Sequence, residues 1–354
     1  MNRDTIAFYD KNASRWASKK RPVRNDGAIA FDATVRRGGV RIDVGSGPGR
    51  YSAALGTPTA AMDASIEMLR LTREIAPDAS LFQADVTALP LRAGSVAGAW
   101  AAMTYHHIDR EQVPMALADL HRALEVGATL DITMAEGDYV GTDMPGDDFP
   151  GRYFACWTGE RLADIVTGAG FDVGTVDVVD GDQTHVVATR ARTLADTVGA
   201  DMRLLVCGLN PSIYSADRGV GYARPGNRFW PAAVAAGLLT RPLKPACALV
   251  DSGIGITDLV KRATTAASEL SKDEYRAGAE RVRRLVEWLQ PRAVCFVGLA
   301  GYRAAINRGA TTGWQPEPFG GRPAYVMPST SGLNARTSFD DLVEHLAATL
   351  RHPR

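Results

Sequence analysis

Short apolar runs alternate with amphipathic stretches throughout this chain, and the alternation starts afresh near residue 202. Strands that alternate with helices indicate βαβ units, so we expect two α/β folds, each with a parallel sheet. The pattern predicts a first domain at residues 1–190, a linker at 191–201 and a second domain at 202–354. A length of 354 residues suits two hydrophobic cores better than one.

The net charge of zero hides a difference between the two halves. The chain has 40 basic and 40 acidic residues, but the first 200 residues are net acidic and the remainder is net basic. Nucleic-acid affinity depends largely on neutralising phosphates, so the basic half is the better candidate for contact with a polyanion.

The four cysteines show no CxxC spacing. This argues against a zinc ribbon, an iron–sulfur cluster or a disulfide framework, and no metal site is expected. Cys207 and Cys295 lie in apolar runs and are predicted core residues. The chain lacks an apolar stretch of membrane-spanning length and a signal-peptide pattern, so we expect a cytoplasmic protein with no membrane partner.

In the first half, "DVGSGPGRY" (residues 43–51) reads as a strand that enters a glycine-rich turn. Glycines there let the backbone turn tightly and let a ligand approach it. Asp63 ends the next predicted strand, where a carboxylate can accept hydrogen bonds from a ribose diol. A dinucleotide and S-adenosylmethionine both fit, but Arg50 stands where the dinucleotide fingerprint needs its third glycine.

With these residues the first half resembles class I S-adenosylmethionine-dependent methyltransferases over about residues 5–190. The resemblance implies a Rossmann-like fold, S-adenosyl-L-methionine as cofactor, and His106 and His107 as residues that line the methyl-acceptor site. It does not identify the methyl acceptor. The cofactor-binding residues that it implies are Asp43, Gly45, Gly47, Gly49, Asp63, Asp85 and Val86.

The second half opens with "GLNPSIYSADRGVGYARPGNRFW" (residues 208–230), an apolar strand that leads into Asn-Pro. We expect a loop here, with helix resuming near Asn227. Breaking an N-glycosidic bond in duplex DNA requires an extruded base, a stacking ring and an oriented water. The barrier falls chiefly by positioning and electrostatics, so the amide of Asn210 could orient the water without being a base. Tyr222 could supply the ring.

These residues resemble the mismatch-specific uracil/thymine DNA glycosylases of the uracil-DNA glycosylase superfamily, over residues 202–350. The family's first motif appears as "GLNPS" and its second, wedge-bearing loop as "VMPSTSGLNAR" (residues 326–336). The resemblance implies an α/β/α fold with a central parallel sheet and no cofactor. Asn210 is the implied catalytic residue; the base-binding residues are Gly208, Leu209, Ser212, Ser215 and Tyr222, and the DNA wedge and backbone residues are Ser331, Gly332, Leu333 and Asn334.

The sequence therefore predicts a monofunctional glycosylase, expected to be a monomer, that removes mispaired uracil from double-stranded DNA. Thymine and other modified pyrimidines remain open as substrates. Simple hydrolysis is expected because neither motif contains a lysine for a Schiff-base step. One alternative is a methyltransferase whose second half delivers it to nucleic acid, and another is a mismatch-binding module without chemistry. Phe229 and Trp230 are predicted core residues.

Overall fold

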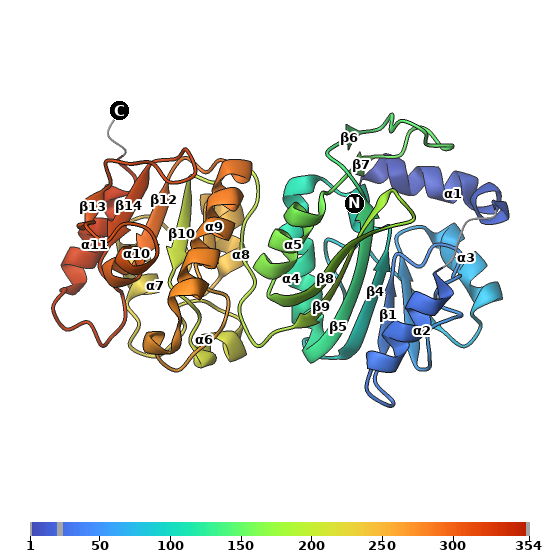
Figure 1. Cartoon of the computed structure of the whole chain (residues 1–354), viewed down its shortest axis with the longest axis horizontal. Coiled ribbons are helices and arrows are strands. Elements are labelled where there is room, and N and C mark those ends of the chain that lie inside the picture. Colours follow the sequence, from blue (N-terminus) through green and yellow to red (C-terminus); the bar gives the residue numbers. More distant parts are fainter. Residues whose placement is uncertain (1, 20–23, 352–354) are drawn as a thin grey trace. The chain divides into compact units, whose positions relative to one another are not determined.

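The computed structural model describes residues 2–19 and 24–351, which form two compact units (Figure 1). The chain passes from the first unit to the second between Ala191 and Arg192, and Gly168–Gly170 group with the second unit. The outermost positions of the predicted domains, 1 and 354, lie outside the described residues.

The first unit is built on a seven-stranded sheet whose strands are parallel from β3 to β5. Only β9 is reversed, because it pairs antiparallel with both β5 and β8. This is the Rossmann-like α/β arrangement that was predicted, and β8 and β9 form an antiparallel pair at its edge. The strands, in spatial order, are β3 (Ser80–Gln83), β2 (Thr59–Asp63), β1 (Arg41–Val44), β4 (Val96–Ala102), β5 (Leu124–Ala135), β9 (Gln183–Arg190) and β8 (Phe171–Val179).

Helices connect and flank these strands, and a short two-stranded pair, β6 (Val140–Gly141) with β7 (Phe154–Ala155), follows β5. Ser65 caps α3, since its side chain accepts a hydrogen bond from the N–H of Met68. The helices are α1 (Arg3–Ser18), α2 (Asn25–Thr34), α3 (Ile66–Ile75), α4 (Val113–Ala123) and α5 (Gly159–Gly168).

The second unit has a five-stranded sheet that is parallel except for the edge strand β13. Side chains alternate across it: Leu205 and Cys207 of β10 join one core cluster, whereas Leu204 and Val206 join the cluster on the other face. The strands, in spatial order, are β11 (Ile254–Asp258), β10 (Leu204–Gly208), β12 (Val294–Val297), β14 (Ala324–Met327) and β13 (Gly313–Trp314).

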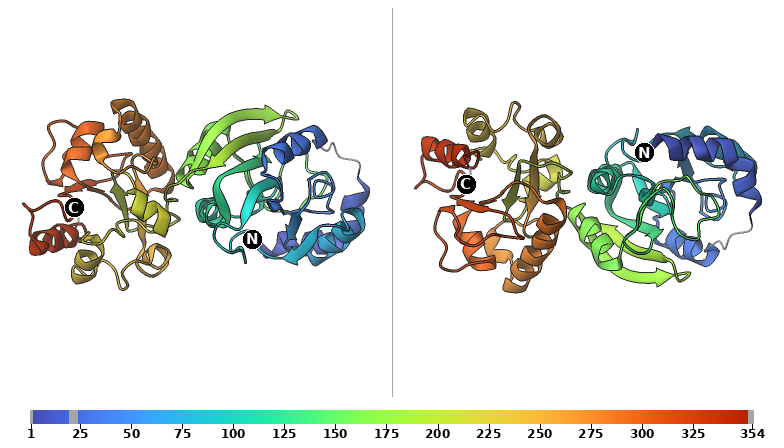
Figure 2. Two further views of the ribbon diagram at one scale, coloured as in Figure 1. Left: turned by 90° about the horizontal axis from the view of Figure 1, so that it is seen from below. Right: turned by 90° about the horizontal axis from the view of Figure 1, so that it is seen from above.

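Helices cover both faces of this sheet and complete the predicted α/β/α architecture (Figure 2). The amphipathic helix α9 (Lys272–Leu289) and α10 (Leu299–Ala305) pack on one face. On the other face lie α7 (Phe229–Ala235), α8 (Pro245–Ser252) and α11 (Phe339–Ala348). Phe229 and Trp230 begin α7 and are buried, as predicted for core residues.

The stretch after the Asn-Pro differs from the expected loop, because a short helix, α6 (Ile213–Arg218), forms inside it. Ser212 is the reason: its hydroxyl accepts a hydrogen bond from the N–H of Ser215 and so caps the first turn. Gly219 ends the helix in the left-handed conformation that favours glycine.

Residues of the predicted linker pack within the second unit. Thr197 exchanges two backbone hydrogen bonds with Ile256 of β11, each 2.8 Å long. The buried carboxylate of Asp196 accepts hydrogen bonds from Arg281 at 2.7 Å and from Lys261 at 2.8 Å. Burial raises the pKa of Asp196, but Arg281 and Lys261 together hold it below its ordinary value. The segment is therefore part of the packed structure of this unit.

Cys207 and Cys295 are buried core residues, as predicted, and their thiols are free. Among the described residues, no helix combines the length and the apolar character that crossing a membrane requires.

Candidate functional sites

The carboxyl ends of the parallel strands in the second unit bring three chain segments to one edge of the sheet, the usual place for a site in such folds. β10 ends at Gly208 and β11 ends at Asp258, and these two residues are directly paired. The loop that carries the second motif follows β14. Because β10 and β14 run in the same direction, the loops that follow them lie at the same edge of the sheet, and these loops carry the two motifs.

Hydrogen bonds donated by its amide nitrogen hold the side chain of Asn210 in one orientation. Nδ2 donates to the carbonyl oxygen of Arg262 at 3.0 Å and to Oγ1 of Thr264 at 2.8 Å. These partners fix the Nδ2 side of the amide, so Oδ1 faces the other way, and it accepts no hydrogen bond from the described residues. The half-buried side chain therefore presents a free acceptor in a fixed position.

The ring of Tyr222 already has one neighbour. It stacks on Phe229 with 4.2 Å between ring centroids and 27° between ring planes, so Phe229 covers one face of the ring. Its φ of 57° is in the left-handed region, which is unusual for a side chain of this size. The hydroxyl is buried without a hydrogen-bond partner among the described residues, and burial raises the pKa of Tyr222 well above its ordinary value.

Sequence reasoning missed Asp258, the last residue of β11. A Cβ built on Gly208 would lie 2.3 Å from Oδ1 of Asp258 and 2.9 Å from the hydroxyl oxygen of Tyr222, so both groups crowd the same glycine. Burial raises the pKa of Asp258 to about 6. The signal in the sequence was an acid at the end of an apolar strand, "GITDLV", but only the register with β10 places it here.

Three predicted base-binding residues make contacts within the protein. The hydroxyls of Ser212 and Ser215 lie 3.1 Å apart as the capping pair of α6, and Ser215 is buried. Leu209 packs against Gly301, where an added Cβ would come within 2.7 Å of its Cδ1. The structure therefore brings Gly208, Tyr222 and Asp258 together, while Ser212 and Ser215 face each other.

The loop after β14 presents one apolar side chain to solvent. Leu333 is 86% exposed, which is unusual for a leucine, and the adjacent Gly332 lies against the backbone of Gly226. Arg228, a residue that the sequence analysis did not single out, holds this loop. Its guanidinium donates to the carbonyl oxygens of Thr337 at 2.7 Å and Asn334 at 2.8 Å.

The other two predicted wedge-loop residues bond within the loop. The amide of Asn334 donates to the carbonyl oxygen of Ser329 at 2.8 Å and to Thr337 Oγ1 at 3.0 Å. The hydroxyl of Ser331 accepts from the N–H of Leu333 at 3.3 Å. In this arrangement Asn334 shapes the loop, and Leu333 is the side chain that points away from it.

A second candidate site is the cavity of about 580 Å³ in the first unit. The glycine turn and the end of β2 form one part of its wall, and α1 with the segment between β6 and β7 forms another. Four of the predicted cofactor-binding residues line the cavity: Gly45, Gly47, Asp63 and Val86.

Two glycines of the turn serve different purposes. Gly47 has a φ of 53°, and nothing lies within 4 Å of the position of a Cβ, so the backbone there is open to a ligand. Gly49 is not a lining residue. A Cβ on it would come within 2.9 Å of the backbone of Thr72, so glycine is required there for packing against α3.

Asp63 has the geometry of a diol acceptor. Its two oxygens accept hydrogen bonds from the N–H groups of Gly47 and Ser65, both at 2.8 Å, which fixes the carboxylate at the cavity wall. Burial raises the pKa of Asp63 to about 6. An ionised carboxylate has about four acceptor sites, so Asp63 retains capacity for a ligand.

Asp43 and Asp85 do not line the cavity. Asp43 is 1% exposed and accepts a hydrogen bond from Ser52 at 2.5 Å, and burial raises its pKa to about 7. Asp85 accepts from the N–H and the hydroxyl of Thr87. Its neighbour Val86 is the member of this pair that reaches the cavity.

Comparison with known proteins gives a family for each half. The model of the uracil DNA glycosylase superfamily matches residues 195–351, and that of a methyltransferase domain matches residues 42–127. The match to the glycosylase superfamily spans Asn210, Tyr222, Asp258 and the loop that bears Leu333.

Similar solved structures include 1,6-didemethyltoxoflavin-N1-methyltransferase from Burkholderia thailandensis, at 20% identity over 53% of this chain and 86% of that one, with a TM-score of 0.42. A methyltransferase from Aquifex aeolicus matches at 19% identity over 51% of this chain and 98% of that one, with a TM-score of 0.41. The chain joins a methyltransferase domain to a domain of the uracil DNA glycosylase superfamily.

Proposed function

We propose that the second half hydrolyses the N-glycosidic bond of mispaired uracil in double-stranded DNA and leaves an abasic site for base-excision repair. The observation that carries this proposal is the fixed amide of Asn210, whose Oδ1 is free to accept a hydrogen bond from a water molecule. Thymine and other modified pyrimidines remain possible substrates.

The residues at the sheet edge fit the demands of such a reaction. The base must leave the duplex and be held while water reaches C1′ of the sugar. Tyr222 would stack on the base with the ring face that Phe229 leaves uncovered. Leu333, exposed at the tip of its loop, would fill the gap in the duplex.

In the chemical step, Oδ1 of Asn210 orients a water molecule whose oxygen lone pair attacks C1′. The C1′–N bond breaks, its electron pair leaves with the base, and the proton of the water passes to solvent or to the departing base. Because an amide is not a strong base, the rate enhancement comes from positioning and electrostatics.

An alkali-cleavage assay tests this proposal. A duplex with one G·U pair is incubated with the protein and then treated with alkali, which cuts at abasic sites. Strand cleavage is expected with the wild type and is expected to fall at least about 100-fold in Asn210→Ala, in line with the loss of a positioning group. The matched control is Asn307→Ala, because that exposed side chain accepts a hydrogen bond from the N–H of Gly309 in its own turn. Undiminished cleavage by Asn210→Ala would remove the proposed mechanism.

A second activity is favoured by the cavity in the first half. We infer that this cavity binds S-adenosylmethionine, with Asp63 accepting from the ribose diol and the open backbone at Gly47 lying against the ligand. The cofactor would supply an activated methyl group. Calorimetric titration with S-adenosylhomocysteine tests this inference: binding is expected for the wild type and is expected to be lost in Asp63→Ala.

A further inference from the structure

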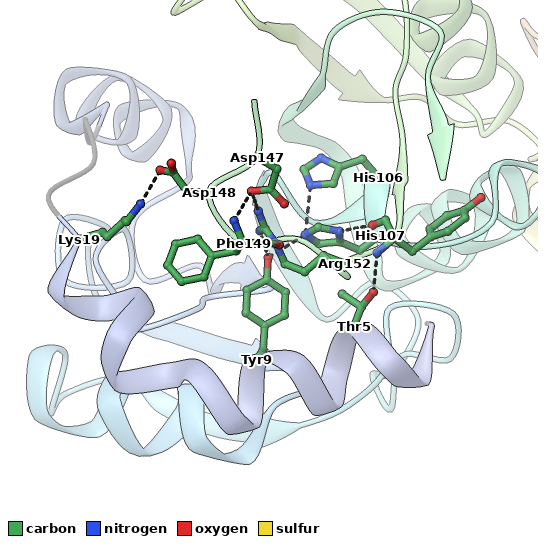
Figure 3. A network of polar contacts seen from close by, with 10 residues as sticks. Thr5, Tyr9, Lys19, His106, His107, Asp147, Asp148, Phe149 and Arg152 are labelled. Carbon is green, nitrogen blue, oxygen red and sulfur yellow. Dashed lines mark hydrogen bonds and ion pairs between the residues drawn. The ribbon is translucent and has the colours of Figure 1, made fainter. Parts of the chain in front are cut away.

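The part of the cavity formed by α1 and the segment between β6 and β7 contains a connected set of polar side chains (Figure 3). Tyr9 from α1, His106 and His107 from the short turn after β4, and Asp147 and Arg152 from the segment before β7 all line it. A molecule bound in this part of the cavity would meet these side chains.

The two histidines are not available to such a molecule. Nδ1 of His107 lies 2.7 Å from the carbonyl oxygen of Tyr153, and its Nε2 lies 2.8 Å from the hydroxyl of Tyr9. Nε2 of His106 lies 3.2 Å from Nε2 of His107, and its Nδ1 accepts from the N–H of Ala135 at 3.3 Å. Burial lowers the pKa of His107 to about 3 and that of His106 well below its ordinary value, so both rings are neutral.

The guanidinium of Arg152, one of the cations that line the cavity, is also engaged within the protein. Arg152, with its side chain 4% exposed, donates to the hydroxyl of Tyr9 at 2.7 Å and to Oδ1 of Asp147 at 2.5 Å. Its guanidinium carbon lies 4.6 Å from the ring centroid of Trp16 and 4.9 Å from that of Phe154. Arg152 is therefore a fixed structural cation rather than a free anion-binding group.

Asp147 differs from these residues. Its Oδ1 accepts from Arg152 and from the N–H of Phe149 at 3.1 Å, but its Oδ2 is buried with no hydrogen-bond partner among the described residues. The side chain is only 8% exposed and lines the cavity. A buried carboxylate oxygen without a donor is costly, so the site is incomplete as it stands.

We propose that Oδ2 of Asp147 accepts a hydrogen bond from an amino or hydroxyl group of the methyl acceptor, which is a small molecule bound in this part of the cavity. A carboxylate accepts and cannot donate, so it selects ligands with N–H or O–H groups and repels anions. The cavity wall here includes Phe154 and the neutral histidine rings, which suits an apolar body behind the donor group. This inference rests on the proposed cofactor site.

The test measures the binding of small aromatic probes by calorimetry, with and without S-adenosylhomocysteine. Benzyl alcohol and benzylamine carry a donor, acetophenone only accepts, toluene does neither, and benzoate is an anion. In the wild type, the two donor probes are expected to bind at least about 10-fold more tightly than toluene or acetophenone, as for a hydrogen bond to a charged group. Benzoate is expected not to bind.

The variant Asp147→Asn should reverse the preference for probes that carry a hydrogen-bond donor. The Oδ1 of the asparagine can keep the bond from Arg152, and its amide nitrogen then faces the cavity as a donor. The advantage of benzyl alcohol and benzylamine should disappear, and acetophenone should gain affinity. The matched control is Asp143→Asn, an exposed position in the same segment that does not line the cavity, which should leave the wild-type ranking unchanged.

Two results would overturn the inference. One is a wild-type protein that binds none of the probes, or that binds toluene and acetophenone as well as the donor probes; this result stands even if the variant fails to fold. The other is a folded Asp147→Asn variant with the wild-type ranking. Failure of S-adenosylhomocysteine to bind would instead refute the proposed cofactor site, so the two failures are distinguishable.

Discussion

The guanidinium of Arg228 donates a hydrogen bond of 2.8 Å to the carbonyl oxygen of Asn334. This bond joins the segment that follows Tyr222 to the loop that presents Leu333, and further bonds from Arg228 to the carbonyls of Thr337 and Ser331 strengthen the connection. The position of the proposed wedge thus depends on a cation that lies outside the proposed base and water sites.

Replacing Arg228 should therefore loosen the loop. In Arg228→Met the carbonyl oxygens of Asn334 and Thr337 lose their donor, and we expect cleavage of the G·U duplex to fall about 10- to 100-fold through mispositioning. Hydrogen exchange of the amides at 331–337 should become faster. Arg308→Met, at an exposed position, is the matched control; equal exchange rates in the two variants would contradict this role.

The variant Leu333→Ala tests whether Leu333 acts as a wedge in DNA or only supports the folded structure. Leu333 is 86% exposed, so the melting temperature should not change, while excision from duplex DNA should fall about 10-fold or more. A single-stranded uracil substrate leaves no gap to fill, and its excision should be unaffected. Val250→Ala is a matched control at a valine that is 82% exposed. Equal losses on both substrates would argue against a wedge.

Asp258 should make the second unit sensitive to pH. Its pKa in the folded protein is raised from 3.8 to about 6, so the folded state binds a proton more readily than the unfolded state does. Stability should therefore fall as pH rises from about 4 through 6, and the cost at pH 8 should reach on the order of 3 kcal/mol.

Asp258→Asn removes that charge and should increase the free energy of unfolding at pH 8 but not at pH 4. Denaturant unfolding at both pH values measures this difference, with the exposed Asp251→Asn as control. If Asp258→Asn gains stability yet loses excision activity, the buried carboxylate is retained for function. No change in stability at pH 8 would show that the carboxylate is well solvated.

Cofactor binding should weaken in acid. The pKa of Asp63 is raised to about 6, and only the carboxylate form accepts both hydrogen bonds of a diol. The affinity for S-adenosylhomocysteine should be constant above about pH 7 and fall as pH decreases through 6, by up to about tenfold per pH unit. Titrations from pH 5 to 8 check this, with exposed Asp78→Asn as control. A wild-type profile that stays flat to pH 5 would exclude Asp63 as the diol acceptor.

The sequence predicted much of this architecture because strand and turn signals are local. The glycine turn, the position of Asp63 and the apolar strands that end at Gly208 and Met327 all follow from short patterns.

The missed residues depend on contacts between distant segments. Asp258 reaches Gly208 through strand register, Arg228 reaches Asn334 across more than 100 residues of chain, and Asp147 meets Arg152 in an irregular segment. Gly49 and Asp43 differ from the other residues of the glycine turn. Both lie in the glycine motif, but helix packing and burial, which the motif does not reveal, keep them out of the cavity wall.

The buried carboxylate of Asp196 has a practical consequence for anyone who wishes to express the second unit alone. A fragment that starts at residue 202 would lack the counter-ion of Arg281 and Lys261 and the backbone partner of Ile256. Uncompensated cations in an interior are costly, so that fragment should be insoluble or prone to proteolysis. A fragment that begins at residue 192 retains all three contacts.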